Sequence, residues 1–184
     1  MTKHPDHKHR RYPQHHHPHD DRPISKGWHP GVKLLICLLV CYGIAATAGY
    51  ATIPEIPGWY ANLIKPPFNP PNWLFGPVWT SLYTMMAVSA WLVWKQQDQP
   101  DEAHREALMI FILQLIFNFA WSFLFFAWHF LMVLFVDVMF LWLMILLTLL
   151  RFRKLSKFAA WLLVPYLLWV TYASVLNGWI MLHN

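Results

Sequence analysis

Aromatic side chains with a few polar companions are the residues of this sequence best suited to bind a ligand, and they recur at helical spacing in three apolar segments. The three stripes are Trp79, Tyr83, Met86 and Ala90; Gln114, Asn118, Trp121, Ser122 and Phe125; and Pro165, Trp169, Tyr172, Ala173, Leu176 and Asn177. Flat aromatic walls with a few polar groups suit a large, flat, apolar ligand. Such stripes more often belong to a plain core, and the pattern by itself favours that interpretation.

A carboxylate also lies deep in an apolar stretch, because Asp137 is the one Asp, Glu, Lys or Arg between positions 107 and 150. An ionisable group inside a membrane span is expected to face the bundle interior or a water-filled cavity. Its position is equally compatible with a ligand site and with a structural hydrogen bond to a neighbouring helix. The amides of Gln114 and Asn118 should also point inward, where interhelical hydrogen bonding is their ordinary role.

The apolar segments hold none of the usual catalytic motifs. The sequence offers them no Ser/His/Asp arrangement, no nucleotide-binding loop and no cluster of metal ligands. Cys37 and Cys41 lie four residues apart in an apolar run, so they are interpreted as small packing residues and not as a disulfide framework. This balance favours ligand binding over catalysis, with no required cofactor and no metal site.

Membrane-spanning helices are the elements expected to position these residues. Only 12% of the 184 residues are charged and 57% are hydrophobic, whereas a soluble domain has about 25% charged residues. A helix needs about 20 apolar residues to cross the hydrocarbon core. Five segments come close to that length: 32–53, 77–94, 107–127, 130–150 and 159–182. The sequence therefore predicts an all-α integral membrane protein, a bundle of five transmembrane helices whose third and fourth members form a tight hairpin.

A loop rich in proline and tryptophan connects the first two segments. Its prolines fix the backbone and remove amide donors, so we expect an ordered, partly extended loop and a helix that starts at Pro77. The aromatic residues of this stretch are Trp59, Tyr60, Phe68, Trp73 and Phe75. Two interpretations remain open: an aromatic anchor at the membrane surface, or a lid that caps a ligand pocket.

The basic residues predict an orientation in the membrane. Thirteen of the fourteen Lys and Arg residues fall on one side of a five-span arrangement, and the exception is Lys65. The positive-inside rule therefore places the N-terminus in the cytosol and the C-terminus on the opposite side. The basic run 151–157 fits contact with lipid headgroups, and it is too short to favour nucleic acid as a partner.

Residues 1–30 are predicted to form a disordered tail that precedes a membrane domain over 31–184. The tail holds eight of the eleven histidines among prolines and basic residues, and it cannot bury enough apolar surface to fold. The cluster at positions 15–19 could chelate zinc, copper or nickel. Its spacing is not that of a closed structural site, so a solvated basic tail is favoured over a metal site.

Three parts of the sequence match, in order, the motifs of one known family. The first runs from Trp59 to Met85 and contains Trp-Tyr, Lys-Pro, Pro-Pro and Pro-Val-Trp at irregular spacings. The second is the Gln…Asn…Trp-Ser…Phe-Phe pattern that starts at Gln114, and the third runs from Pro165 to Asn177. Over about residues 32–184 the chain resembles the TspO/MBR family, the tryptophan-rich sensory proteins related to the mitochondrial translocator protein.

The resemblance implies a five-helix membrane protein, commonly a homodimer, that binds protoporphyrin IX or haem-related tetrapyrroles. It implies a sensor, transporter or regulator of porphyrin metabolism, with a light-dependent porphyrin-degrading enzyme or a sterol or lipid translocator as the alternatives. Degradation would depend on two pocket tryptophans, which correspond to Trp79 and Trp169. Tyr60, Asn118 and Ala173 correspond to other ligand-contacting positions.

Together with the stripes, the resemblance gives the expected set of ligand-binding residues. The set is Trp59, Tyr60, Trp79, Tyr83, Asn118, Trp121, Ser122, Asp137, Trp169, Tyr172 and Ala173. Sterol binding has weaker support, because the family's sterol pattern needs Lys or Arg shortly after a Tyr near the C-terminus and none follows Lys157. The expected partners are membrane lipid, a tetrapyrrole and a second copy of the chain, with sterol in doubt.

Overall fold

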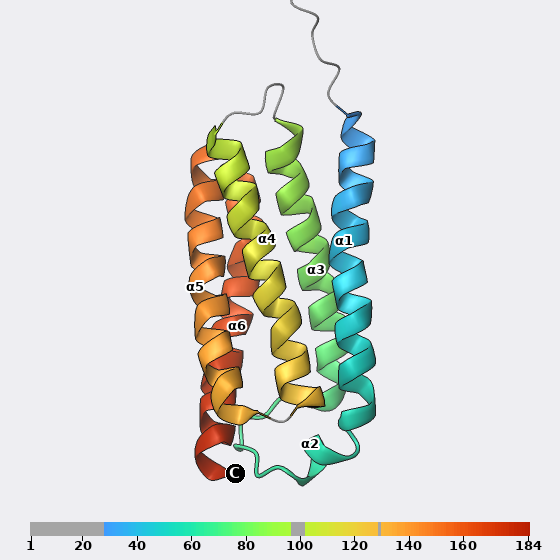
Figure 1. Ribbon diagram of the computed structural model, residues 1–184, viewed down its shortest axis with the longest axis vertical. Coiled ribbons are helices and arrows are strands. Elements are labelled where there is room, and N and C mark those ends of the chain that lie inside the picture. The colour runs from blue at the N-terminus through green and yellow to red at the C-terminus, as the bar shows by residue number, and fades with distance from the viewer. Residues whose placement is uncertain (1–27, 97–101, 129) are drawn as a thin grey trace, which may run out of the picture.

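The protein is built from helices. The computed structural model describes residues 28–96, 102–128 and 130–184, and within these ranges no residue lies in a strand. The five long helices are α1 (Pro30–Thr52), α3 (Asn72–Lys95), α4 (Glu102–Ser122), α5 (Leu131–Leu155) and α6 (Lys157–His183). The short ones are a 3₁₀ turn (Ile53–Glu55), α2 (Trp59–Asn62) and a π-helical turn (Phe123–Ala127). Figure 1 shows the long helices side by side in one bundle, which confirms the predicted all-α class.

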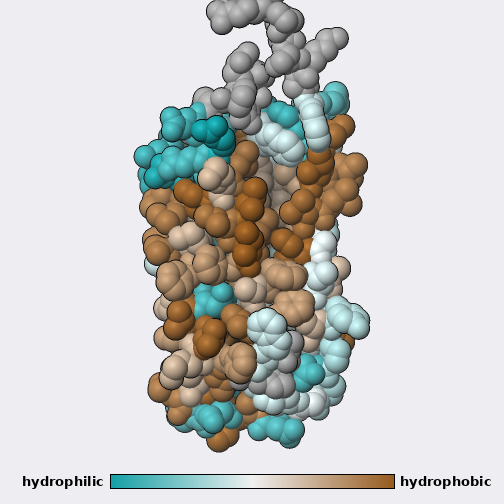
Figure 2. All heavy atoms as spheres, viewed as in Figure 1, coloured by the Kyte–Doolittle hydropathy of each residue, from teal (hydrophilic) through white to brown (hydrophobic). Residues whose placement is uncertain are grey.

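Among the residues that the structure describes, four helices are long and apolar enough to cross a membrane. They are Pro30–Glu55, Glu102–Phe125, Leu131–Leu155 and Lys157–His183. The remaining long helix, α3, is of similar length but carries more hydroxyl side chains, and it is not among the four. On the face shown in Figure 2, a broad hydrophobic band separates hydrophilic ends. Such a band matches the hydrocarbon layer of a bilayer, so the chain is an integral membrane protein.

Basic residues gather at one end of the bundle. The start of α1, the end of α3, the start of α4 and the turn between α5 and α6 all lie at that end (Figure 1). The loop that contains α2 lies at the opposite end, together with the C-terminus. The predicted separation of Lys65 from the other described basic residues is therefore present in three dimensions. Of the predicted tail, residues 1–27 lie outside the described part of the chain.

The helix α3 begins five residues earlier than predicted. It starts at Asn72 and runs through Pro77, which has no amide hydrogen to donate to the Trp73 carbonyl. The proline therefore removes one backbone hydrogen bond without ending the helix, as Pro165 also does within α6 after Val164. The loop before α3 is also less extended than predicted, because α2 forms one helical turn between its prolines.

Small residues and a buried lysine join α1 to α3. Cys37 and Cys41 are buried and unbonded to each other, which confirms their interpretation as packing residues. Lys33 is 7% exposed, and its Nζ donates to the Trp94 carbonyl at 3.1 Å, near the end of α3. A lysine at a helix C-terminus satisfies a carbonyl that has no helical partner.

Two helical hairpins form the other side of the bundle. The predicted hairpin of α4 and α5 is confirmed, and the rings of Phe117 and Phe140 stack across it at 5.9 Å. A single residue, Ser156, joins α5 to α6. Its amide donates to the Phe152 carbonyl at 2.6 Å, and its hydroxyl accepts from the Ala159 amide at 3.3 Å. Ser156 therefore ends one helix and caps the next.

Candidate functional site

A cavity of about 430 Å³ lies near the end of the bundle that carries α2. Its walls come from the last turns of α1 and the 3₁₀ turn, the first turns of α3 and the end of α4. The lining residues are Ala45, Ala48, Gly49, Thr52, Ile53, Ile56, Asn72, Trp73, Phe75, Gly76, Trp79, Thr80, Tyr83, Trp121 and Ser122. None of these side chains carries a charge at neutral pH. The volume and the mostly apolar lining are typical of a site for an organic ligand.

Trp79 forms the inner wall of this cavity, and three other rings pack around it. The centroid of its ring lies 5.6 Å from that of Tyr83, 5.9 Å from that of Trp121 and 6.3 Å from that of Tyr166. Aromatic pairs at these separations stabilise one another. Trp79 is only half-buried, so its neighbours hold the indole in place while part of it stays accessible.

Behind this wall, a buried chain of hydrogen bonds joins α3, α4 and α6. The Tyr83 hydroxyl donates to Asn118 Oδ1, and Asn118 Nδ2 donates to the Tyr166 hydroxyl oxygen at 2.9 Å. Each of the three side chains is at most 3% exposed. Both ends of the amide are therefore satisfied inside the bundle. Asn118 does not line the cavity, and the structure gives it the interhelical role that was one of its two predicted alternatives.

Ser122 brings a hydroxyl group to the inner part of the cavity. Its side chain is buried, and no protein partner for its Oγ is found in the described part of the chain. Two of the other hydroxyls that line the cavity are engaged, because Tyr83 donates to Asn118 and Thr80 donates to the Gly76 carbonyl at 2.9 Å. The Ser122 hydroxyl is therefore available to a polar atom of a ligand.

The end of α4 connects the cavity wall to the α2 loop. The helix widens into the π-helical turn, and the Phe125 ring stacks on Trp121 at 5.9 Å with 5° between the ring planes. The same ring meets Trp59 at 5.2 Å and Tyr60 at 5.9 Å. Single π-helical turns frequently occur at functional sites. Trp59 and Tyr60 thus reach the cavity wall through Phe125 and do not line the cavity themselves.

Hydrogen bonds within the loop fix its shape. The Tyr60 hydroxyl donates to Asn69 Oδ1 at 2.8 Å, and burial raises the pKa of this phenol above its ordinary value. Lys65 Nζ donates to the carbonyls of Tyr60 at 2.7 Å, Ala61 at 3.0 Å and Leu63 at 3.0 Å. The lysine therefore adds donors for the carbonyls at the end of α2, one of which, that of Tyr60, also accepts from the Leu63 amide at 3.3 Å.

Two further contacts tie the loop to α6. The Tyr172 hydroxyl donates to the Phe68 carbonyl at 2.6 Å. The Asn184 side chain forms two hydrogen bonds with the Ile64 backbone. Its Oδ1 accepts from the Ile64 amide at 2.9 Å, and its Nδ2 donates to the Ile64 carbonyl at 3.1 Å. Tyr172, predicted to contact ligand, therefore holds the loop and does not line the cavity.

The two tryptophans implied in degradation lie in different surroundings. Trp79 lines the cavity, whereas Trp169 does not. Trp169 packs on Phe75 at 6.2 Å and on Tyr172 at 5.6 Å, so it stands behind a lining residue. Ala173 is half-buried on the same helix and is also absent from the lining.

The buried face of α6 includes Leu176 and Asn177 of the predicted stripe, but it differs from the stripe nearer the start of the helix. Pro165 is exposed, whereas Tyr166 is fully buried. Tyr166 was not among the expected site residues, although its spacing from Val170 and Leu163 follows the helical pattern of a buried face. The other contribution that the sequence did not indicate is the cavity wall from α1, where Ala45 and Gly49 leave space because their side chains are small or absent.

Asp137 faces the bundle interior as predicted, but it lies outside the cavity lining. Its side chain is 8% exposed, and its Oδ2 has no hydrogen-bond partner in the described part of the chain. On the adjacent helix α6, the Nδ2 of the buried Asn177 is likewise unpartnered. Within the same ranges, no group of three or more His, Cys, Asp or Glu side chains could hold a metal ion. The histidine cluster of the tail lies outside them.

Comparison with known proteins supplies an independent result. The family model described as TspO/MBR family matches residues 36–182. A tryptophan-rich protein TspO from Chlorobaculum tepidum is 39% identical over 160 residues, which cover 83% of this chain and 98% of that protein. A tryptophan-rich sensory protein from Cereibacter sphaeroides is 38% identical over 144 residues, 78% of this chain and 87% of the relative. The human translocator protein is 36% identical over 119 residues, 65% of this chain and 70% of its own length.

Proposed function

The chain belongs to the TspO/MBR family, and we propose that it binds a tetrapyrrole, such as protoporphyrin IX or a haem-related molecule, in the cavity beside Trp79. In this proposal the protein acts in the membrane as a sensor, transporter or regulator of porphyrin metabolism. The names of its relatives, a sensory protein and a translocator protein, support that class of role. The observation that carries the proposal is the uncharged cavity walled by Trp79, Tyr83 and Trp121.

The chemistry of the cavity suits a large planar ligand. A macrocycle can stack on the accessible part of Trp79, whose position is fixed by the rings behind it. The Ser122 hydroxyl can meet a polar atom of the ring or of its substituents. The α2 loop, joined to the wall through Phe125, serves as the cap of the pocket.

The proposal includes an arrangement in the membrane. All five long helices span the bilayer, α3 among them, because its hydroxyl groups are largely satisfied within its own helix or by neighbouring helices. The basic end lies in the cytosol, following the positive-inside rule, and the C-terminus lies on the opposite side. The functional unit is a homodimer, as the family resemblance implies.

Light-dependent degradation of porphyrin is the second candidate. It has one supporting observation, namely that Trp79 lines the cavity where a porphyrin would lie. The other tryptophan assigned to that chemistry, Trp169, is separated from the cavity by Phe75. The described geometry therefore favours binding over degradation. A sterol or lipid translocator remains the third candidate, supported by the apolar lining alone.

The test is a titration of the purified protein in detergent with protoporphyrin IX, followed by quenching of tryptophan fluorescence in the dark. Trp79→Phe should weaken binding by roughly 2- to 10-fold, because the phenyl ring offers a macrocycle a smaller stacking surface than the indole does. Trp161→Phe is the matched control, because Trp161 is 70% exposed on the outer surface of α6. It should leave the affinity unchanged. Saturable quenching that both variants retain at full strength would place the ligand elsewhere.

Illumination separates the first two candidates. Loss of the porphyrin absorption bands in the wild type, but not in Trp79→Phe, would favour the degrading enzyme. Stable bands in both proteins would favour binding without chemistry. If protoporphyrin IX gives no saturable quenching at all, the tetrapyrrole proposal is wrong, and sterol or lipid translocation becomes the leading candidate.

A further inference from the structure

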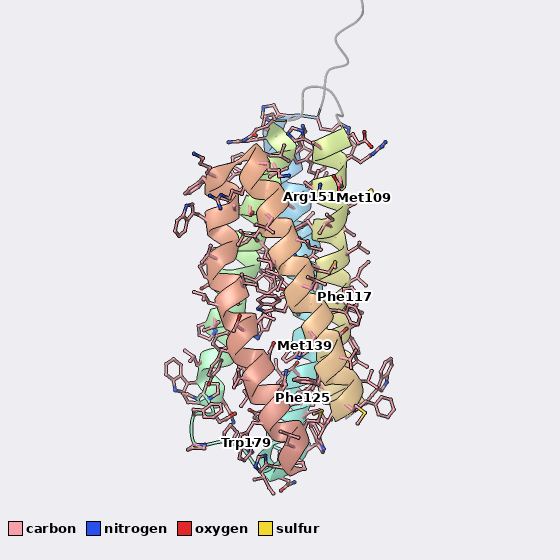
Figure 3. The ribbon with its side chains drawn as sticks, turned by 90° about the vertical axis from the view of Figure 1, so that its left-hand side faces the viewer. Met109, Phe117, Phe125, Met139, Arg151 and Trp179 are labelled. Carbon is pink, nitrogen blue, oxygen red and sulfur yellow. The ribbon has the colours of Figure 1, made fainter. Side chains whose placement is uncertain are left out.

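A second hollow lies at the basic end of the bundle, on the outer surface of α5. It is a groove of about 550 Å³ lined by Leu147, Leu150, Arg151, Arg153 and Lys154. Four of these residues follow the spacing i, i+3, i+4 and i+7, so they form one face of the helix. The groove is at the opposite end of the molecule from the aromatic cavity; Figure 3 places Arg151 near one end and Trp179 near the other.

The groove changes from apolar to cationic along the helix axis. Leu150 is 45% exposed, and Leu147 lies one turn further toward the middle of the bilayer. Arg153 and Lys154 follow in the last turn of α5, and both are exposed. This order matches the order of groups in a phospholipid, whose acyl chains lie below a charged headgroup.

The charges available to a ligand come from two of the three cations. Arg151 Nη1 is bound to Glu106 Oε2 at 2.7 Å, so its charge is largely offset. Within the described part of the chain, Arg153 and Lys154 have no acidic partner. The same end of the bundle carries seven described Lys and Arg residues against two described Glu residues. The local field therefore favours an anion.

We propose that this groove binds an anionic phospholipid, with its headgroup phosphate between Arg153 and Lys154 and its upper acyl chain along Leu150 and Leu147. Charge complementarity selects an anionic over a zwitterionic lipid, and the apolar part selects a lipid over a free phosphate. The site is independent of the tetrapyrrole cavity, because the two share no lining residue. It gives the membrane domain a lipid preference separate from its ligand preference.

The test measures lipid retained by the purified protein in native mass spectrometry, with phosphatidylglycerol and phosphatidylcholine offered in equal amounts. The variant is Arg153→Gln/Lys154→Gln. A matched control is Arg105→Gln/Lys157→Gln, which removes one Arg and one Lys that are also exposed and at the same end but outside the groove. The thermal stability of each variant in phosphatidylcholine serves as the check on folding. The single variants Arg153→Gln and Lys154→Gln should retain amounts of phosphatidylglycerol between those of the wild type and the double variant.

The groove variant should retain phosphatidylglycerol about 25-fold more weakly, at roughly 5-fold for each cation removed near the surface. The control variant should keep the wild-type preference. Equal losses in both double variants would mean a general attraction to the basic end, which overturns the proposal. Two further outcomes would also overturn it: no preference for phosphatidylglycerol in the wild type, or displacement of the lipid by glycerol phosphate that has no acyl chain.

Discussion

Two buried amides on α4 should respond in opposite ways to the loss of their polar atoms. Asn118 and Gln114 lie one helical turn apart and are each 1% exposed. Asn118 joins Tyr83 to Tyr166 through both ends of its amide. Gln114 has one long contact, from Nε2 to the sulfur of Met86 at 3.8 Å, and its Oε1 is unpartnered in the described part of the chain. The perturbations are Asn118→Leu and Gln114→Met, which preserve the approximate shapes.

The expected magnitudes follow from these contacts. Hydrogen bonds between membrane helices contribute about 0.6 kcal/mol on average and about 1.7 kcal/mol at most. Asn118→Leu removes two of them and leaves two buried phenol groups without that partner, so it should lower the free energy of unfolding by roughly 1 to 3 kcal/mol. Gln114→Met removes a weak contact and an unsatisfied acceptor, whose burial costs about 1 to 3 kcal/mol. It should be neutral or stabilising by about 1 kcal/mol.

The assay is unfolding in mixed micelles, monitored by circular dichroism as the fraction of denaturing detergent increases. A double-mutant cycle of Asn118→Leu with Tyr83→Phe isolates the hydrogen bond, because the second change removes the other partner. The coupling energy should be about 0.6 to 1.7 kcal/mol. Equal destabilisation by Asn118→Leu and Gln114→Met, or a coupling energy of zero, would mean that the hydrogen bonds of Asn118 do not stabilise the bundle.

Three further predictions concern the loop, a close helix contact and the basic end. Asn184→Ala removes both hydrogen bonds to the Ile64 backbone, so the Ile64 amide should exchange its hydrogen roughly 3- to 10-fold faster, with little change in the amides of α6. Unchanged exchange in a hydrogen-exchange measurement would show that these two bonds do not hold the loop. Gly178→Ala places a Cβ about 3.0 Å from the Phe135 ring, whereas the Cβ of Gly43→Ala meets nothing within 4 Å. The Gly178→Ala protein should therefore be less stable than the Gly43→Ala protein by about 1 kcal/mol in the same unfolding assay. Equal stabilities would contradict the tight contact. Glu106→Gln breaks the ion pair with Arg151, whose two side chains are 41% and 45% exposed. The free energy of unfolding should therefore fall by less than about 0.5 kcal/mol, and the loss should shrink in high salt. A larger loss that salt does not change would mean that the pair is structurally important.

The fold could be predicted largely from the sequence because the bilayer imposes strong rules on composition and length. Apolar runs near 20 residues and segregated basic residues suffice to place the helices. The errors occurred around prolines, which interrupt helices less than the rule expects. Pro77 was expected to begin a helix, yet α3 starts five residues before it and passes through it. The prolines around α2 were expected to keep the loop partly extended, yet the eight residues between Pro57 and Pro66 allow one helical turn.

The candidate site was predicted less completely because a cavity depends on which face each helix presents. Of the residues expected to bind ligand, Trp79, Tyr83, Trp121 and Ser122 line the cavity. In the first half of α6 the buried face differs from the predicted stripe, so Tyr166 is buried in the bundle and Trp169 lies outside the cavity. Nearly every residue of that helix is apolar, so the sequence carries little amphipathic signal from which to choose a face. α1 contributes to the cavity mainly by leaving space at Ala45 and Gly49, and no sequence motif marks such a contribution.

The single-residue connection between α5 and α6 has a consequence for how the protein is made. Because Ser156 is the single residue between them, we expect α5 and α6 to enter the bilayer together as a hairpin. A tag or a longer linker inserted at this position should therefore weaken the pairing of the two helices during synthesis. A tag placed after Asn184 should be tolerated if it leaves intact the two hydrogen bonds between the Asn184 side chain and the Ile64 backbone.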